Sequence, residues 1–433
     1  MSQRGEGSSG ERGEGARRHG APDPLFSLTA ALCRGLAIAV AALIGVGCSD
    51  KGTAPEAAIE IAAVSGGGQT GTAGLVLPAA LVAEVRDERG EPLEGISVRF
   101  AVTDGGGALT DTNVVTGSDG RVAVEWFLGP IAGPNMANAI VGEHSATFSA
   151  IAAAPSPATT YHGRNQYIEY LPGDLPIVIS APHGGTLVPS EIPDRTSGTT
   201  VRDTNTEELV RTIGDALAAL TGKRPHVIIC RLRRIKLDAN REIVEAAQGN
   251  RLAQRAWFEY HSFIDAAKEA VLDGHGRGFY IDLHGHGHEI DRLELGYLLS
   301  ATELGLADAT IEETTYENRS SIRELSQRSA ASFAGLLRGP TSLGALLENQ
   351  GFAAVPSVSQ PDPGTDPYFS GGYNTARHGS ETAGEFSGVQ IEAHYEGVRD
   401  NATNRATFAA ALAAVLDAYL AAHAGLDIRP LAR

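Results

Sequence analysis

Short runs of β-prone residues, separated by Gly, Asp and Asn, fill the chain from about residue 57 to residue 153. The segment shows no helical periodicity, and its glycines stand where turns with positive φ are expected. The pattern predicts strands at residues 58–64, 81–85, 96–102, 121–127 and 146–151. Short strands joined by such turns are typical of a β-sandwich, which we expect over residues 55–152.

The pattern changes after residues 153–160, an Ala, Pro and Ser-rich linker. Beyond the linker, apolar runs that predict strands alternate with longer segments that predict helices. The expected strands cover residues 177–180, 227–237, 278–283, 294–299 and 388–394, and the expected helices cover residues 206–220, 253–272 and 402–424. This alternation predicts an α/β domain with a largely parallel or mixed sheet over residues 161–430. We expect residues 301–372, helical only in places, to shape a substrate cleft.

The N-terminal region has the composition of an export signal. Residues 1–23 are too polar to form a core, and residues 35–47 are an apolar run too short to span a bilayer comfortably. Gly45-Val-Gly-Cys48 resembles the lipobox of bacterial lipoproteins, although Gly45 stands where Leu is usual. We expect residues 1–48 to be a disordered start and a signal, Cys48 to be lipidated, and the exported chain to be anchored in the cell envelope, periplasmic or at the surface. An ordinary cleaved signal and an uncleaved anchor are the alternatives.

Charge and cysteine content exclude several classes of function. The formal net charge is −17, which argues against a nucleic-acid partner. Of three cysteines, Cys33 lies in the expected signal, Cys48 is the expected anchor, and Cys230 lies alone in an apolar strand. The chain therefore offers no disulfide framework, and a metal site must use nitrogen and oxygen ligands.

Polar residues end three of the expected strands: His183, His284 and Glu392. Ligands of open α/β sheets bind at the carboxyl ends of strands. Two histidines and a carboxylate are the usual protein ligands of a catalytic zinc, and a further glutamate is the usual base. Asp282 shares a strand face with His284, so it could orient that ring or act as a ligand itself. The residues predict a zinc site, with a solvated His/Gly loop as the alternative.

The carboxylate ligand is expected to be Asp203 or Glu207. Both lie near the start of the helix predicted at residues 206–220, and they share a face if the helix already includes Asp203. Capping of the helix N-terminus is the alternative role for either acid.

A basic cluster follows the strand expected at residues 227–237. In an extended run, residues 234, 236, 238 and 240 would share one face. Arg234, Asn240 and Arg241 would then suit a substrate carboxylate or a scissile carbonyl. A set of salt bridges is the alternative interpretation.

Motifs of the first segment resemble bacterial Ig-like domains of the invasin and intimin type. They are Ser65-Gly-Gly-Gly-Gln-Thr-Gly-Thr, Leu77-Pro, Gly90-Glu-Pro-Leu-Glu-Gly, Gly105-Gly-Gly and Asp119-Gly-Arg-Val-Ala-Val. The resemblance implies a spacer or an adhesive unit.

Six motifs of the second segment occur in the order found in the N-formylglutamate amidohydrolase family. They are Ser180-Ala-Pro-His183-Gly-Gly, Asp203 with Thr206-Glu-Glu-Leu209, Arg234 with Leu237-Asp-Ala-Asn-Arg241, Tyr280-Ile-Asp-Leu-His284, Tyr368 with Gly371-Gly-Tyr373, and Val389-Gln-Ile-Glu392. That family is similar to the zinc carboxypeptidase and aspartoacylase superfamily. The resemblance implies a three-layer phosphorylase/hydrolase-like α/β fold with a mixed sheet and one zinc.

The same resemblance implies roles for individual residues. His183 and His284 would be zinc ligands, and Glu392 would be the general base. Substrate would be held by Arg234, Asn240 and Arg241, with Tyr373 nearby.

Departures from the family pattern bear on the substrate. Thr186 replaces the glutamate of the carboxypeptidase His-x-x-Glu pair, and His394 follows Glu392 where the family usually continues towards Arg-x-Leu-Tyr. Export also separates this chain from cytoplasmic histidine degradation, so we do not expect N-formylglutamate to be its substrate. We expect an exported zinc-dependent hydrolase of C–N bonds, acting on a small molecule or peptide with a carboxylate. An inactive, adhesin-like binding lipoprotein is the alternative.

Overall fold

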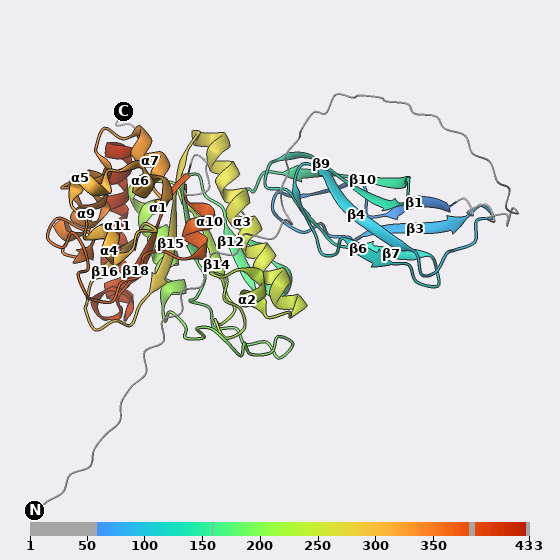
Figure 1. The fold of residues 1–433 in the computed structure, drawn as a ribbon, viewed down its shortest axis with the longest axis horizontal. Helices are drawn as coiled ribbons and strands as arrows, with labels where there is room; N and C mark the ends of the chain where they lie inside the picture. Colours follow the sequence, from blue (N-terminus) through green and yellow to red (C-terminus); the bar gives the residue numbers. More distant parts are fainter. Residues whose placement is uncertain (1–58, 158, 381–385, 430–433) are drawn as a thin grey trace, which may run out of the picture. The chain divides into compact units, whose positions relative to one another are not determined.

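The computed structural model describes residues 59–157, 159–380 and 386–429. The expected signal segment and the lipidation of Cys48 lie outside these residues and stay predictions. The described residues form an all-β region and a region in which helices cover a mixed sheet (Figure 1).

The all-β region has two main sheets. One contains β1 (Ile59–Ser65), β3 (Leu81–Asp87) and β7 (Arg121–Val124), and the other contains β2 (Gln69–Thr72), β10 (His144–Ala153), β9 (Gly133–Val141), β4 (Ser97–Asp104) and β6 (Asn113–Val115). A short pair joins β5 (Gly107–Leu109) to β8 (Trp126–Leu128). Alternate residues of both sheets, among them Ala83, Val85, Phe100 and Phe148, are buried in one shared core. Two sheets that enclose a core form a β-sandwich, as predicted.

All five strands predicted for this region are present, and four others are added. The strand expected at residues 121–127 is divided between β7 and β8. The strands β2, β5, β6 and β9 were not predicted. The longest of them, β9, begins at Gly133-Pro134 and is rich in Ala and Asn, which carry little strand preference.

The second region is built on an eight-stranded sheet. In spatial order its strands are β11 (Tyr161–His162), β12 (Ile168–Leu171), β14 (His226–Cys230), β13 (Ile177–Ala181), β15 (Gly278–Gly285), β18 (Phe386–Ala393), β16 (Leu293–Gly296) and β17 (Ala354–Val355). The four central strands, β14, β13, β15 and β18, run parallel, whereas β12 and β16 run antiparallel to their central neighbours. The mixed sheet is therefore confirmed, and its central strands end at one edge.

Helices cover both faces of this sheet (Figure 1). The long ones are α1 (Thr206–Thr221), α3 (Arg251–His275) and α11 (Ala402–His423). Ile177 and Ile179 of β13 pack in the cluster that contains residues of α1 and α11, whereas Val178 packs in the cluster that contains residues of α3. Because successive strand residues point to opposite faces, this division shows a three-layer arrangement.

The α11 helix is long and apolar enough to cross a membrane, judged by length and composition alone. Most of that apolar window, 56%, is buried inside the protein, and its residues Phe408, Leu412 and Leu416 belong to the central core. Burial of this kind identifies α11 as the core helix of a folded domain.

Short helices fill the segment for which the sequence predicted interrupted helical structure. They are α4 (Ala301–Leu304), α5 (Asp308–Ile311), α6 (Thr314–Arg319), α7 (Arg323–Arg328), α8 (Phe333–Arg338) and α9 (Leu343–Asn349). Three more lie beside the long elements: α2 (Ile243–Ala247), α10 (Tyr373–His378) and the turn η2 (Tyr395–Arg399).

The prediction of one strand over residues 227–237 was wrong. The strand β14 ends at Cys230, and the chain then turns, with the N–H groups of Lys236 and Leu237 both donating to the carbonyl of Arg233. The basic residues that follow are therefore not displayed on alternate faces of a strand. Cys230 itself is buried, and burial raises the pKa of its thiol to about 12, which fits an inert core residue.

Candidate metal centre

Three neighbouring strands bring the predicted residues to one edge of the sheet. His183 follows β13 by two residues, His284 lies in β15, and Glu392 lies in β18 as the register partner of His284. Two glycines explain the turn after His183. A Cβ on Gly184 would lie 2.4 Å from the nitrogen of Glu207, and one on Gly185 would lie 2.3 Å from the carbonyl carbon of Arg231. Only glycine lets the backbone pass this closely.

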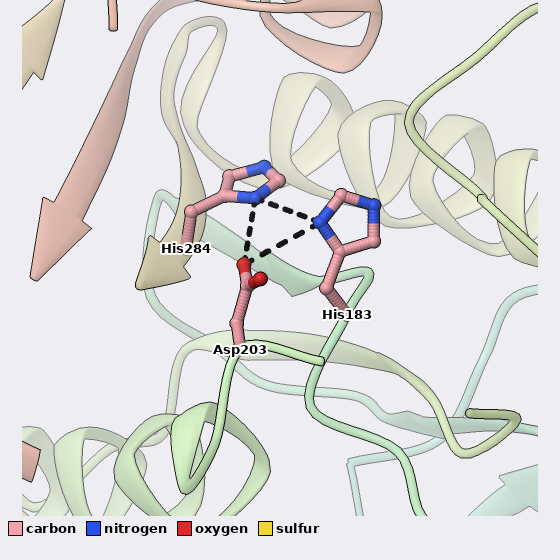
Figure 2. Close-up of side chains that lie close together, drawn as sticks. All are labelled: His183, Asp203 and His284. Atoms are coloured by element: carbon pink, nitrogen blue, oxygen red, sulfur yellow. Dashed lines mark hydrogen bonds and ion pairs between the residues drawn. The ribbon is translucent and has the colours of Figure 1, made fainter. Parts of the chain in front are cut away.

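Asp203 completes a cluster with the two histidines (Figure 2). Its Oδ2 lies 3.2 Å from Nδ1 of His284 and 3.4 Å from Nδ1 of His183, and the two Nδ1 atoms are 3.1 Å apart. All three side chains are buried. Asp203 lies before α1, which begins at Thr206, and its Oδ2 also accepts a hydrogen bond from the N–H of Gly285 at 3.1 Å.

Carboxylates orient both rings from behind. Nε2 of His183 lies 2.6 Å from Oδ1 of Asp238, and Nε2 of His284 lies 3.0 Å from Oδ2 of Asp282. Burial raises the pKa of each carboxyl, but the neighbouring histidine outweighs this effect and the pKa of both acids lies below the usual value. Ionised carboxylates can only accept, so each ring donates from Nε2 and turns its Nδ1 inward.

The two Nδ1 atoms and Oδ2 of Asp203 each carry a lone pair, and they lie 3.1–3.4 Å apart. Lone pairs this close repel one another unless a proton or a cation lies between them. In the chain alone a proton meets this need: burial lowers the pKa of His284, but Asp282 and Asp203 outweigh burial and hold it well above the usual value. Atoms about 3.3 Å apart are also the corners of a tetrahedron around a metal with bonds of about 2.0–2.1 Å. Two imidazoles and one carboxylate therefore fit zinc or another divalent transition metal.

Glu392 lies beside this cluster in a buried position. Burial, followed by the negative charges of Asp203 and Glu294, raises the pKa of Glu392 to about 8. Its Oε1 accepts a hydrogen bond from Nε2 of Gln390 at 3.0 Å. A carboxyl group of this kind holds a proton more readily than an exposed one, which is the property needed for proton transfer.

The basic cluster reaches the site through a turn instead of a strand. Nε of Arg234 donates to Oδ2 of Asp238 at 2.9 Å, and a terminal nitrogen of Arg234 lies 3.8 Å from Asp203. Asn240 lies against His284, with its Nδ2 3.3 Å from Nε2 of that ring. Arg241 donates to the carbonyl of Asn240 at 2.7 Å.

A cavity of about 730 Å³ opens over these groups. Four arginines line it: Arg202, Arg234, Arg241 and Arg399. Arg202 and Arg399 were not expected from the sequence to reach the site. The exposed rings of Phe369 and Tyr395 also line the cavity.

The structure places two expected residues elsewhere. Glu207 pairs with Arg211, one turn later in α1, at 3.0 Å, so it does not join the two histidines. The ring of Tyr373 packs 6.2 Å from that of Trp257, and its hydroxyl accepts from Arg377 at 3.2 Å. Tyr373 is not among the described residues that line the cavity, whereas the preceding Gly371 and Gly372 are.

Comparison with known proteins gives weak structural similarities. No protein-family model matches the chain, and no curated protein matches it. One similar solved structure is an N-formylglutamate amidohydrolase from Ralstonia eutropha JMP134, with 13% identity, coverage of 57% of this chain and 93% of that chain, and a TM-score of 0.35. The D00-D0 domain of intimin has 16% identity, coverage of 22% and 46%, and a TM-score of 0.17.

Domains 4 and 5 of the S-layer protein SbsC have 16% identity, coverage of 23% and 48%, and a TM-score of 0.19. This chain therefore spans about half the length of the intimin and SbsC fragments. All three TM-scores lie below 0.5.

Proposed function

We propose that this protein is a metal-dependent hydrolase of C–N amide bonds. The observation that carries the proposal is the convergence of His183, Asp203 and His284 beside the buried Glu392, at the floor of a cavity. Two oriented imidazoles, one carboxylate and a separate carboxyl group are the parts that metal-assisted hydrolysis requires.

A divalent cation held by His183, Asp203 and His284 would supply Lewis-acid chemistry, polarising a carbonyl and making water more acidic. The chain's own base is Glu392. It accepts a proton from the attacking water, and the leaving nitrogen must gain a proton before the C–N bond breaks. A cation bound by the three ligands would lower the pKa of Glu392 from about 8 towards neutral pH. At such a pKa the carboxyl group can both accept and release a proton.

The arginines of the cavity favour a substrate with a negative charge. Arg234 is already paired with Asp238, so it offers its remaining N–H groups to a carbonyl oxygen. The side chain of Arg241 is 35% exposed; its Nε lies 3.2 Å from Glu245, and one terminal nitrogen donates to the carbonyl of Asn240. A guanidinium so placed suits a substrate carboxylate, and we assign this role to Arg241 together with Asn240. The substrate class is an N-acyl amino acid or a peptide with a free carboxylate.

The location of the protein also belongs to the proposal. The apolar run followed by Cys48 supports export and a lipid anchor in the cell envelope. An enzyme held there would meet peptides outside the cytoplasm.

Elemental analysis of the purified chain tests the metal centre, with a His284→Ala variant beside it. We expect about one transition metal ion at this centre in the wild type and its loss from the variant. Hydrolysis is then tested with a panel of N-acyl amino acids and N-blocked dipeptides, including benzoylglycyl-L-phenylalanine. Metal binding without hydrolysis would favour the alternative of an inactive binding protein. Absence of any transition metal, after purification without chelators, would overturn the proposal.

A further inference from the structure

A second pair of acid and imidazole lies in the wall of the same cavity, and its imidazole, His288, lines the cavity. Glu294 of β16 is fully buried, and its Oε1 lies 2.8 Å from Nδ1 of His288, which follows β15. Its Oε2 accepts a hydrogen bond from the N–H of Phe369 at 2.8 Å. A carboxylate buried in this way needs such partners, because it has lost its hydration.

The pair fixes the orientation of His288. A carboxylate oxygen accepts the hydrogen bond, so Nδ1 of His288 is the nitrogen that donates. The ring also stacks on that of Phe369, with centroids 4.7 Å apart and planes 9° from parallel. His288 lines the cavity, and 22% of its side chain is exposed. With Nδ1 held by Glu294, Nε2 on the opposite side of the ring remains for proton exchange.

Strand register places this pair next to the proposed base. Glu392 is the partner of His284 across β15 and β18, and the partner of Glu294 across β18 and β16. The three residues therefore form a row across three strands, with Glu392 between the metal centre and the pair. Glu392 and His288 both line the cavity, so one substrate can contact both residues.

A metal-binding role for the same residues is less well supported. His286, His288 and Glu294 lie close enough to hold a cation. However, both ring nitrogens of His286 are engaged: Nε2 lies 2.8 Å from the carbonyl oxygen of Arg292, and Nδ1 accepts the N–H of His288 at 3.2 Å. Only His288 and Glu294 would remain as ligands.

We propose that His288, oriented by Glu294, is the proton donor to the leaving amine nitrogen. This role rests on the proposed amide hydrolysis. Glu392 takes one proton from the attacking water as the C–O bond forms, and Nε2 of His288 gives one proton to nitrogen as the C–N bond breaks. Transfer of the proton from Glu392 to His288, through solvent in the open cavity, restores both groups. Histidine suits the task because Nε2 can give up or take a proton while Nδ1 keeps its hydrogen bond to Glu294.

The test compares an amide with a thioester in a His288→Asn variant. The probes are benzoylglycyl-L-phenylalanine and its analogue in which sulfur replaces the scissile N–H. An amine must be protonated to leave, whereas a thiolate leaves without a proton. We expect kcat/KM of the variant to fall about 10²–10⁴-fold on the amide and less than about tenfold on the thioester. A Glu294→Gln variant, which keeps an acceptor for Phe369, should change the same ratio in the same direction by a smaller factor.

The matched control is His144→Asn, which removes an exposed histidine of β10 and should leave both rates unchanged. Equal losses on the two substrates would overturn the role of His288 while the hydrolase stands. Loss of a metal ion from His288→Asn would overturn it in favour of a second cation site. A wild-type chain that cleaves neither probe would overturn the proposed function and this role with it.

Discussion

Nε2 of His183 lies 2.6 Å from Oδ1 of Asp238, on the side of the ring opposite the meeting point with Asp203 and His284. Asp238 also accepts hydrogen bonds from the N–H of Asn240 and from Nε of Arg234. The buried carboxylate of Asp238 thus positions His183, Arg234 and Asn240. The proposed metal centre therefore depends on Asp238, which is not among its proposed ligands.

An Asp238→Asn variant should therefore bind metal more weakly. An amide at this position has no negative charge with which to orient and polarise the ring of His183. We therefore expect metal affinity, measured by competition with a chelator, to fall by about 10–100-fold. Asp194→Asn is the control, because Asp194 is exposed and pairs with Lys236 on the same stretch of chain. Unchanged affinity in Asp238→Asn would show that the contact does not orient the ligand.

Glu392→Gln should separate binding from turnover. Glutamine keeps the size of the side chain and cannot accept a proton, so kcat should fall about 10²–10⁴-fold while the metal content stays at the wild-type value. The matched control is Glu396→Gln, an exposed acid of η2 close in sequence. A variant that retains more than a tenth of the wild-type kcat would rule out Glu392 as the base.

The metal-free chain should lose stability as pH rises through the titration of Glu392. Burial raises the pKa of Glu392 from 4.5 to about 8, so between these values the folded state holds a proton that the unfolded state releases. The stabilisation is fully present below pH 4.5 and is lost as pH rises through 8. Urea unfolding with a chelator present, at pH 5, 6.5 and 8, should show this decline relative to Glu392→Gln. Parallel profiles for the two chains would contradict the raised pKa.

Gly185→Ala should disturb the metal centre through the backbone. The added Cβ would lie 2.3 Å from the carbonyl carbon of Arg231, so the turn that carries His183 must move. We expect a loss of about 1–3 kcal/mol in the free energy of unfolding, by analogy with overpacked cores, and weaker metal binding. The control is Gly287→Ala, where a Cβ meets no atom within 4 Å and both quantities should stay unchanged. Equal unfolding free energies and metal affinities in the two variants would show that the turn accommodates the added Cβ without cost.

The basic segment shows where sequence reasoning fails. Alternation along a strand was expected to align Arg234 with Asn240, but the strand ends at Cys230. Both residues still line the cavity, because the segment that carries them contacts His183 through Asp238, at the end of β13. Residue type was informative here, and the assumed local geometry was not. The same holds for Tyr373, whose side chain packs against Trp257 beside the site.

The sequence by itself determined which polar residues lie at the ends of three central strands, and the chemistry those residues carry. Runs of apolar residues that end in His183, His284 and Glu392 are local signals, and parallel strands place such residues at one edge. Only the tertiary structure shows that Asp203, and not Glu207, lies against the two histidines, because α1 begins at Thr206 and the loop before it folds back onto Gly285. The pairing of His288 with Glu294 was decided in the same way. Such contacts depend on how loops close over the sheet, and side-chain periodicity carries no information about that.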